Sequence, residues 1–213
     1  MKQAATKISK LLFLGLIALL PARAMAAVDL LPLHGMDEDG IHIQPWINDT
    51  FKDVLDDMET AKIEGKRLLY IYVQQGCKSC KKLHEINFRY PQIVDYINKH
   101  FYVVQFNMRG VVTVTDIDGK EMGENEFSAR SAVNKTPTLQ FFPTDLSALK
   151  GKHGINAEAY RFIGYQKPEI FINQLAYIQG EHFKAEPNFI KWYQGATDLI
   201  SLDPVNDDNL AIK

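Results

Sequence analysis

One stretch constrains this chain more than any other: an apolar run that leads directly into two cysteines. Residues 68–73 are aliphatic, β-branched or aromatic, which is typical of a buried strand. The run breaks at Gly76, and Cys77 and Cys80 follow with the spacing C-x-x-C at the start of a predicted helix. These are the two cysteines of the whole sequence. A thiol pair at a strand-to-helix turn is typical of a redox site.

The first 26 residues have the three parts of a secretory signal. Lys2, Lys7 and Lys10 form a basic region, residues 11–20 are uninterruptedly apolar, and residues 24–26 place alanines where a signal peptidase recognises small side chains. The apolar run is shorter than the roughly 20 residues that a membrane-spanning helix needs. The sequence therefore predicts cleavage after the first 26 residues and a soluble, exported protein.

The charge balance of the mature chain argues against nucleic acid as a partner. The whole sequence has 24 basic and 26 acidic side chains, and the predicted signal carries four of the basic ones. Cleavage leaves 20 basic and 26 acidic side chains, a formal charge of −6 on 187 residues. A mildly acidic chain without a basic cluster is not typical of a nucleic-acid-binding protein. Its length is sufficient for one domain with a sizeable core.

The cysteine count argues against a purely structural disulfide. Exported scaffolds that depend on disulfides carry several pairs at wide spacings. Here the single pair, Cys77 and Cys80, closes a loop too short to restrict the unfolded chain appreciably. Chemistry is therefore the better explanation of the pair.

Hydrophobic periodicity predicts alternating helices and strands along the mature chain. The apolar centre of 101–107 indicates a buried strand in a parallel pair, and Asp118-Gly119 indicates a hairpin turn. In chain order, the expected elements are a helix over 51–63 with its cap at 48–50, a strand over 68–73, a helix to about residue 89, a helix from Pro91, a strand over 101–107, a hairpin over 111–122, a short helix over 125–133, strands over 139–142 and 159–163, and a helix from Pro168.

Composition divides the chain into four parts. The predicted signal covers 1–26, and a Pro- and Gly-containing arm without sustained periodicity covers 27–49. The main domain is expected over 50–180. Residues 181–213 combine a last amphipathic helix with an acidic, polar tail, which we expect to be mobile from Ser201.

The order of these elements resembles the thioredoxin fold, with C-x-x-C after the first core strand and a Thr-Pro pair before the third. The amino-acid sequences of residues 76–84, 90–94 and 101–104 are similar to those of bacterial exported thioredoxin-related proteins, among them the SoxW-type thioredoxins associated with sulfur oxidation. The resemblance implies an α/β fold of the thioredoxin-like class. Its central mixed sheet is flanked by helices and supplemented by an N-terminal arm, a small hairpin insertion and a C-terminal helical extension.

The resemblance also assigns a role to Thr136 and Pro137. The matching proline in the family takes the cis form and faces the disulfide, which implies that these two residues form the substrate-docking edge. A cis peptide bond is accessible before proline, and an extended substrate can pair with the neighbouring backbone. The residues alone leave an alternative open, in which Pro137 is an ordinary trans proline that opens a strand.

Four positions depart from the family pattern. Gly76 stands where a tryptophan is usual, Lys78-Ser79 replaces Gly-Pro between the cysteines, and Ile71 occupies the position of a buried acid. The group that deprotonates the second cysteine is therefore open, with a water, Lys81 or Glu85 as candidates.

The position of each cysteine predicts its part in the chemistry. Only a thiolate attacks a disulfide, and a helix N-terminus favours that anion. We expect exposed Cys77 to be the attacking nucleophile and shielded Cys80, one turn into the helix, to resolve the mixed disulfide. Lys78, Ser79 and Lys81 are expected to tune the pKa of the thiol.

The sequence thus predicts a periplasmic thiol:disulfide oxidoreductase that needs no cofactor. Its expected partners are protein or small-molecule thiols and disulfides, with a membrane thiol protein as electron donor if it works as a reductase, the favoured direction. Two alternatives stay open. In one, Cys80 and His84, spaced i, i+4, bind copper or zinc in a metallochaperone, although the remaining histidines are scattered in the sequence. In the other, a non-catalytic adaptor retains the fold.

Overall fold

Strand β1 (Arg67–Val73) lies at the centre of a four-stranded sheet and is buried along its whole length. It pairs in parallel with β2 (Phe101–Asn107) and antiparallel with β5 (Thr138–Phe141). Strand β6 (Tyr160–Ile163) extends the sheet antiparallel to β5. The order β2-β1-β5-β6 is a mixed sheet, which confirms the predicted α/β class.

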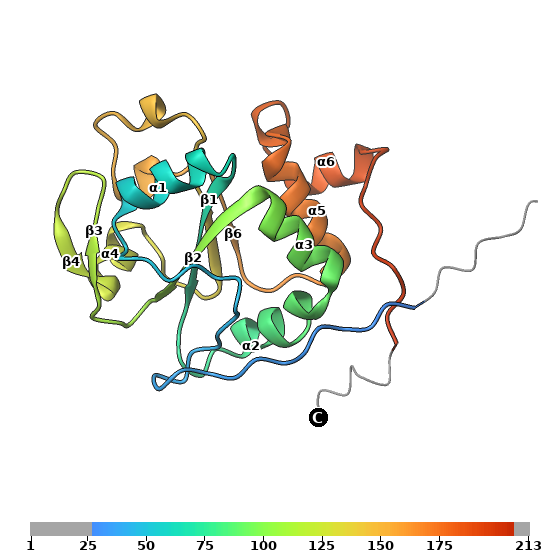
Figure 1. The fold of residues 1–213 in the computed structure, drawn as a ribbon. Coiled ribbons are helices and arrows are strands. Elements are labelled where there is room, and N and C mark those ends of the chain that lie inside the picture. The colour runs from blue at the N-terminus through green and yellow to red at the C-terminus, as the bar shows by residue number, and fades with distance from the viewer. Residues whose placement is uncertain (1–26, 207–213) are drawn as a thin grey trace, which may run out of the picture.

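Helices cover both faces of this sheet (Figure 1). The computed structural model describes residues 27–206, so the predicted signal and residues 207–213 lie outside the described part of the chain. The helices on one face are α2 (Lys78–Glu85), α3 (Pro91–His100) and α5 (Pro168–Gln179), and those on the other are α1 (Val54–Ile63) and α4 (Glu124–Arg130). Short 3-10 helices connect the elements at Asn87–Arg89, Leu146–Leu149, Gly154–Ala157 and His182–Lys184.

Alternation along β1 builds two hydrophobic cores, because successive side chains of a strand point to opposite faces. Leu69, Ile71 and Val73 pack in one core with α2, α3 and α5. Leu68, Tyr70 and Tyr72 pack in the other with α1 and α4. The apolar run is continuous because both faces of the strand are covered.

The predicted hairpin is confirmed and packs beside α4. It consists of β3 (Thr113–Thr115) and β4 (Glu121–Gly123), and Gly119 adopts the positive φ of 75° that its turn requires. The Arg130 guanidinium of α4 binds Asp116 at 3.0 Å and Asp118 at 2.6 Å. These ion pairs fix the hairpin to the domain.

Helix α1 begins later than its periodicity predicts. The side chain of Asp53 caps the helix by accepting the backbone N–H groups of Leu55 and Asp56, so the predicted cap at 48–50 is wrong. Lys52 has a positive φ of 55°, which separates Phe51 from the helix. Phe51 is consequently 98% exposed instead of lying on the buried face.

The N-terminal arm covers the open edge of β2. The backbone and side-chain N–H groups of Asn48 both donate to the Val103 carbonyl, at 2.8 and 3.0 Å. The Gln105 side-chain amide donates to the carbonyl of His42 at 2.9 Å. The arm therefore occupies the Val103 carbonyl, a backbone group that an exposed edge strand would leave open to another chain.

The C-terminal extension packs on α5 and returns to the arm. Helix α6 (Phe189–Gly195) contacts the Tyr177 ring of α5 through Phe189 and Trp192. The tail that we expect to be mobile from Ser201 contacts the rest of the chain up to residue 206: the Asp203 N–H donates to Gln92 at 2.7 Å, and Val205 forms a bridge with Val28. None of the helices within 27–206 has the length and apolarity needed to cross a membrane.

Candidate active site

The turn after β1 brings the cysteine pair to the end of the sheet. Gly76 has a positive φ of 72°, a conformation that favours glycine, and this turn leads the chain into α2. Cys77 is the N-cap of α2, and it forms a disulfide with Cys80 over a Cα–Cα distance of 5.2 Å. The structure therefore places the two cysteines at the helix start, as predicted.

The two cysteines differ in their exposure to solvent. Cys77 is partly exposed, whereas Cys80 is 2% exposed and packs in the core behind α2. The backbone N–H of Cys80 points at Cys77 Sγ at 3.0 Å. When the pair is reduced, this donor and the N-terminal end of α2 favour a negative charge on Cys77.

Thr136 and Pro137 lie beside the disulfide. Thr138 at the start of β5 is paired with Tyr72 near the end of β1, so the residues before β5 reach the turn that carries Cys77. The Thr136–Pro137 peptide bond is cis, and the Thr136 carbonyl oxygen lies 3.4 Å from Cys77 Sγ. The Pro137 carbonyl accepts the Gly164 N–H at 2.7 Å. The structure therefore places Thr136 next to Cys77, and its role in substrate docking stays a prediction.

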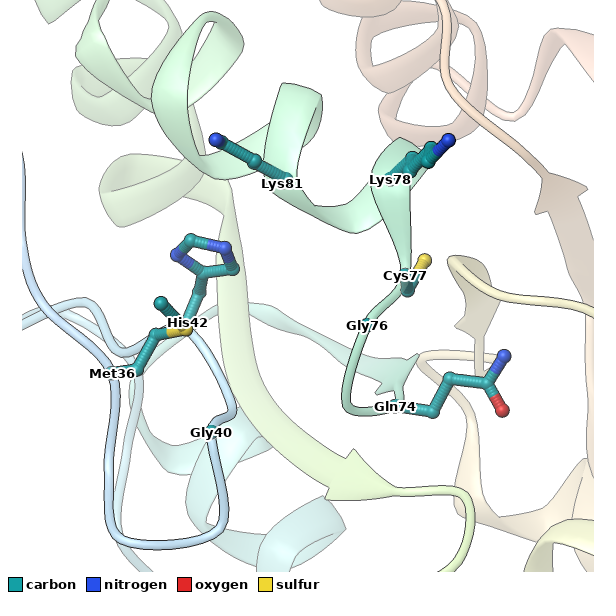
Figure 2. A pocket seen from close by; sticks show the side chains of 8 residues that line it. All are labelled: Met36, Gly40, His42, Gln74, Gly76, Cys77, Lys78 and Lys81. Atoms are coloured by element: carbon teal, nitrogen blue, oxygen red, sulfur yellow. The ribbon is translucent and has the colours of Figure 1, made fainter.

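The three residues that were expected to tune the thiol lie on the first turns of α2. Lys78 and Lys81 are exposed, and Figure 2 shows their side chains extending to either side of the helix. Ser79 is half-buried on the same turn. Lys81 also lies 3.7 Å from Glu85 in a loose, exposed ion pair. The Cys80 backbone N–H contacts the Cys77 sulfur directly, and the tuning role of the lysines stays a prediction.

Helix α2 carries a buried histidine that pairs with a histidine of the arm. The rings of His84 and His42 stack with centroids 5.3 Å apart, and Phe88 packs edge-on against His84. The Gln44 amide lies 3.4 Å from His84 Nδ1. Burial, and then the nearby His42, lower the pKa of His84 to about 3, so its ring is neutral at ordinary pH. The sequence separates these two histidines widely, and the fold brings them together.

The metal-binding alternative gains no third ligand from the fold. Cys80 and His84 do share a helix face, but nowhere in 27–206 do three or more His, Cys, Asp or Glu side chains form a group able to hold a metal ion. Cys80 is engaged in the disulfide, and the His84 ring is packed between His42 and Phe88.

A hollow of about 180 Å³ opens beside Cys77 (Figure 2). One side is formed by the turn before α2 and by its first residues, and the other by Met36, Gly40 and His42 of the arm. The sequence predicts an irregular arm over 27–49 but not this lining role. The Asp-Glu-Asp-Gly run at 37–40 is a turn signal that marks the loop, but it does not predict where the loop lies.

Comparison with known proteins identifies a domain within the chain. A model of the family described as thioredoxin-like domain matches residues 54–179, which is more than half of the chain. A search of curated proteins with this chain found no match. Similar solved structures include a thioredoxin-fold protein from Helicobacter pylori, at 19% identity over 61% of this chain and 81% of that chain, with a TM-score of 0.45. A thioredoxin from Thermus thermophilus is 15% identical over 68% of this chain and 95% of its own, with a TM-score of 0.47. The oxidised C-terminal domain of Neisseria meningitidis DsbD is 10% identical over 57% of this chain and 89% of its own, with a TM-score of 0.39.

Proposed function

This chain belongs to the thioredoxin-like domain family, and on that premise we propose that it is a thiol:disulfide oxidoreductase whose working group is the Cys77–Cys80 pair. One observation carries the proposal: a partly exposed sulfur lies at a helix N-terminus, with its disulfide partner buried behind it. An accessible sulfur next to a shielded one suits an exchange reaction that proceeds in two steps.

The proposed reduction of a substrate transfers two electrons. The Cys77 thiolate attacks one sulfur of a substrate disulfide, so a Cys77–substrate bond forms and the other substrate sulfur leaves as a thiolate. The Cys80 thiolate then attacks Cys77 Sγ, and the second substrate sulfur leaves. The substrate gains two thiols, and the protein reaches the disulfide form seen in the structure.

We further propose that the protein works mainly as a reductase in the periplasm, in the manner of exported SoxW-type thioredoxins. The predicted secretory signal supports this location, and it lies outside the described residues. Reduction in an oxidising compartment needs a dithiol donor, for which we propose a membrane thiol protein. Protein or small-molecule disulfides are the proposed substrates.

Two cysteine variants test the exchange reaction. We expect the wild type to reduce insulin disulfides with dithiothreitol as donor, Cys77→Ser to lose this activity, and Cys80→Ser to accumulate mixed disulfides with its substrates. The variant that carries both substitutions cannot form mixed disulfides and is the negative control for trapping. Full activity of Cys77→Ser would overturn the proposal, and stoichiometric Cu(I) uptake without exchange would favour the metallochaperone.

Two further measurements test direction and location. The reduction potential of the Cys77–Cys80 pair, measured against glutathione, should be about −270 mV for a reductant, whereas a value of about −120 mV would indicate an oxidant. Cell fractionation of the full-length protein, compared with a variant that lacks residues 2–26, should recover only the former from the periplasm. Retention of both in the cytoplasm would contradict the proposed location.

A further inference from the structure

We propose that residues 36–42 of the arm, the arm loop, form the second wall of the substrate site and select substrates that carry an apolar side chain and a carboxylate beside the reactive cysteine. The proposal rests on the oxidoreductase function above and names the substrate class of that same site. The matched family domain begins at residue 54, so the arm loop lies outside it and is an addition to the family domain.

The arm loop is closed by its own hydrogen bonds. Met36 and His42 form an antiparallel bridge, and Asp37 exchanges two bonds with Ile41: its N–H donates to the Ile41 carbonyl at 2.9 Å, and its side chain accepts the Ile41 N–H at 2.8 Å. Gly40 has a positive φ of 71° and lies against the side chain of Gln75. These contacts define the shape of the loop without help from a ligand.

The arm loop is also fastened to the helix that carries the cysteines. Ile41 is buried in the same hydrophobic core as Cys80 and Leu83. The His42 ring stacks on His84, one turn of α2 beyond Cys80. A wall that is attached to the redox helix in this way keeps a constant distance from Cys77, as a selective site requires.

The chemistry of the hollow defines what it accepts. Met36 lines the hollow and is 59% exposed. The flexible methionine side chain adapts to apolar side chains of different shape. Lys78 and Lys81 line the hollow, and among the described residues that line it none is a carboxylate. The arm loop carries three acidic residues, Asp37, Glu38 and Asp39, but none of them lines this hollow, and Asp39 lines a neighbouring hollow together with Arg109. An apolar side chain next to a carboxylate is therefore the best match in shape and charge.

Cys77 lies between the two walls, and Figure 2 shows its Sγ turned away from Met36 and His42. The Thr136 carbonyl oxygen lies 3.4 Å from Cys77 Sγ, and Cys77 itself lines the hollow that Met36 borders. A substrate joined to Cys77 is thus next to both the Thr136 edge and the arm loop. The residues that flank its cysteine reach the Met36 side of the hollow.

Three disulfide-bridged peptide dimers test the proposal directly. They differ only in the two residues before the cysteine, which are Leu-Glu, Leu-Lys or Ser-Glu. We expect wild-type kcat/KM to be highest for Leu-Glu, by about fivefold over each of the others. The advantage over Leu-Lys should decrease with added salt, and the advantage over Ser-Glu should not, because only the former is electrostatic.

A matched pair of arm variants locates the apolar selection. Leu33 lies on the same arm and is also 59% exposed, but it does not line the hollow. Met36→Ala should bring the Leu-Glu to Ser-Glu ratio close to one, whereas Leu33→Ala should keep the wild-type ratio. Equal ratios in the two variants would overturn the role of the arm loop.

A second pair locates the charge selection. Lys81→Gln should reduce the Leu-Glu to Leu-Lys ratio, and Lys99→Gln, on α3, should not. The wild-type reaction with a small aromatic disulfide separates the two proposals. If the wild type reduces neither this reagent nor any peptide, the oxidoreductase function fails. If it reduces all of them without preference, only the substrate class fails.

Discussion

The His42 ring of the arm stacks on the His84 ring of α2, with centroids 5.3 Å and planes 24° apart. This contact joins a segment outside the matched domain to the helix that carries both cysteines. It also brings a second imidazole beside the buried His84, where burial and His42 together lower the pKa of His84 to about 3. The first prediction follows from that shift.

Stability should decrease in mild acid because of His84. Since its pKa is depressed in the fold, the unfolded chain binds the proton more readily below about pH 6.5. The stability that depends on a neutral His84 ring is fully present above pH 6.5 and is lost as the pH falls towards 3. Between pH 7 and pH 5 we expect a loss of about 2 kcal/mol in the free energy of unfolding, measured with urea. His84→Gln should remove this loss.

His153→Gln controls for the general effect of replacing a histidine, since His153 precedes a 3-10 helix outside the His42–His84 contact. An acid dependence that is the same in wild type and His84→Gln would contradict the assignment to this residue.

In the reduced protein, the two cysteines should react with iodoacetamide at very different rates. Cys77 is partly exposed and its sulfur faces the Cys80 N–H at 3.0 Å, whereas Cys80 is buried. We expect Cys77 to be alkylated at least about tenfold faster at neutral pH, because reaction requires both access and thiolate. Peptide mass spectrometry after short exposure measures the ratio. Equal labelling of both cysteines in the folded protein would contradict the assigned roles.

The buried pair of Tyr70 and Asp57 should make a pH-dependent contribution to stability. The Tyr70 O–H donates to Asp57 at 2.8 Å, and this bond lowers a carboxyl pKa that burial raises. Tyr70→Phe should therefore raise the pKa of Asp57 further and destabilise the fold by about 1–3 kcal/mol at pH 7. The loss should be smaller near pH 4, where the carboxyl group binds a proton.

Tyr72→Phe is the matched control for this prediction. The Tyr72 O–H donates to the neutral Gln140 side chain at 2.7 Å, so its removal should cost stability to a similar degree at both pH values. Parallel pH profiles for the two variants would exclude a charged partner for Tyr70.

Loss of one arm contact should loosen the cover of β2. The Asn48 side chain donates to the Val103 carbonyl at 3.0 Å, and Asn48→Asp replaces this donor by an acceptor of the same shape. We expect a loss of about 1–2 kcal/mol and faster amide hydrogen exchange along β2. Asn48→Ala, which adds no repulsion, should give a smaller effect. Unchanged exchange in both variants would indicate that the backbone of the arm alone protects the strand.

Most of the framework could be predicted because its signals are local. The apolar run of β1, the turn at Gly76 and the Asp118-Gly119 hairpin each show their structure within a few residues. The placement of Thr136 beside Cys77 was implied only by the family resemblance, because it depends on the pairing of β1 with β5.

The missed features depend on contacts between distant residues. Phe51 has the right spacing for the buried face of α1, but Lys52, which contacts Thr115 and Glu124, turns the backbone and leaves Phe51 exposed. The pairing of His42 with His84 has no periodic signature, since one residue lies in an irregular arm and the other on a helix. The same holds for Met36 and the hollow beside Cys77.

The bridge between Val28 and Val205 has a consequence for the order of folding. It joins residues from nearly opposite ends of the described chain, and Asn206 adds a side-chain bond to Asp29 at 2.9 Å. A contact across so long a loop has a large closure entropy, so it should form after the sheet and helices are in place. The arm, which also forms one wall of the redox hollow, should therefore gain its contact with the C-terminal segment late in folding.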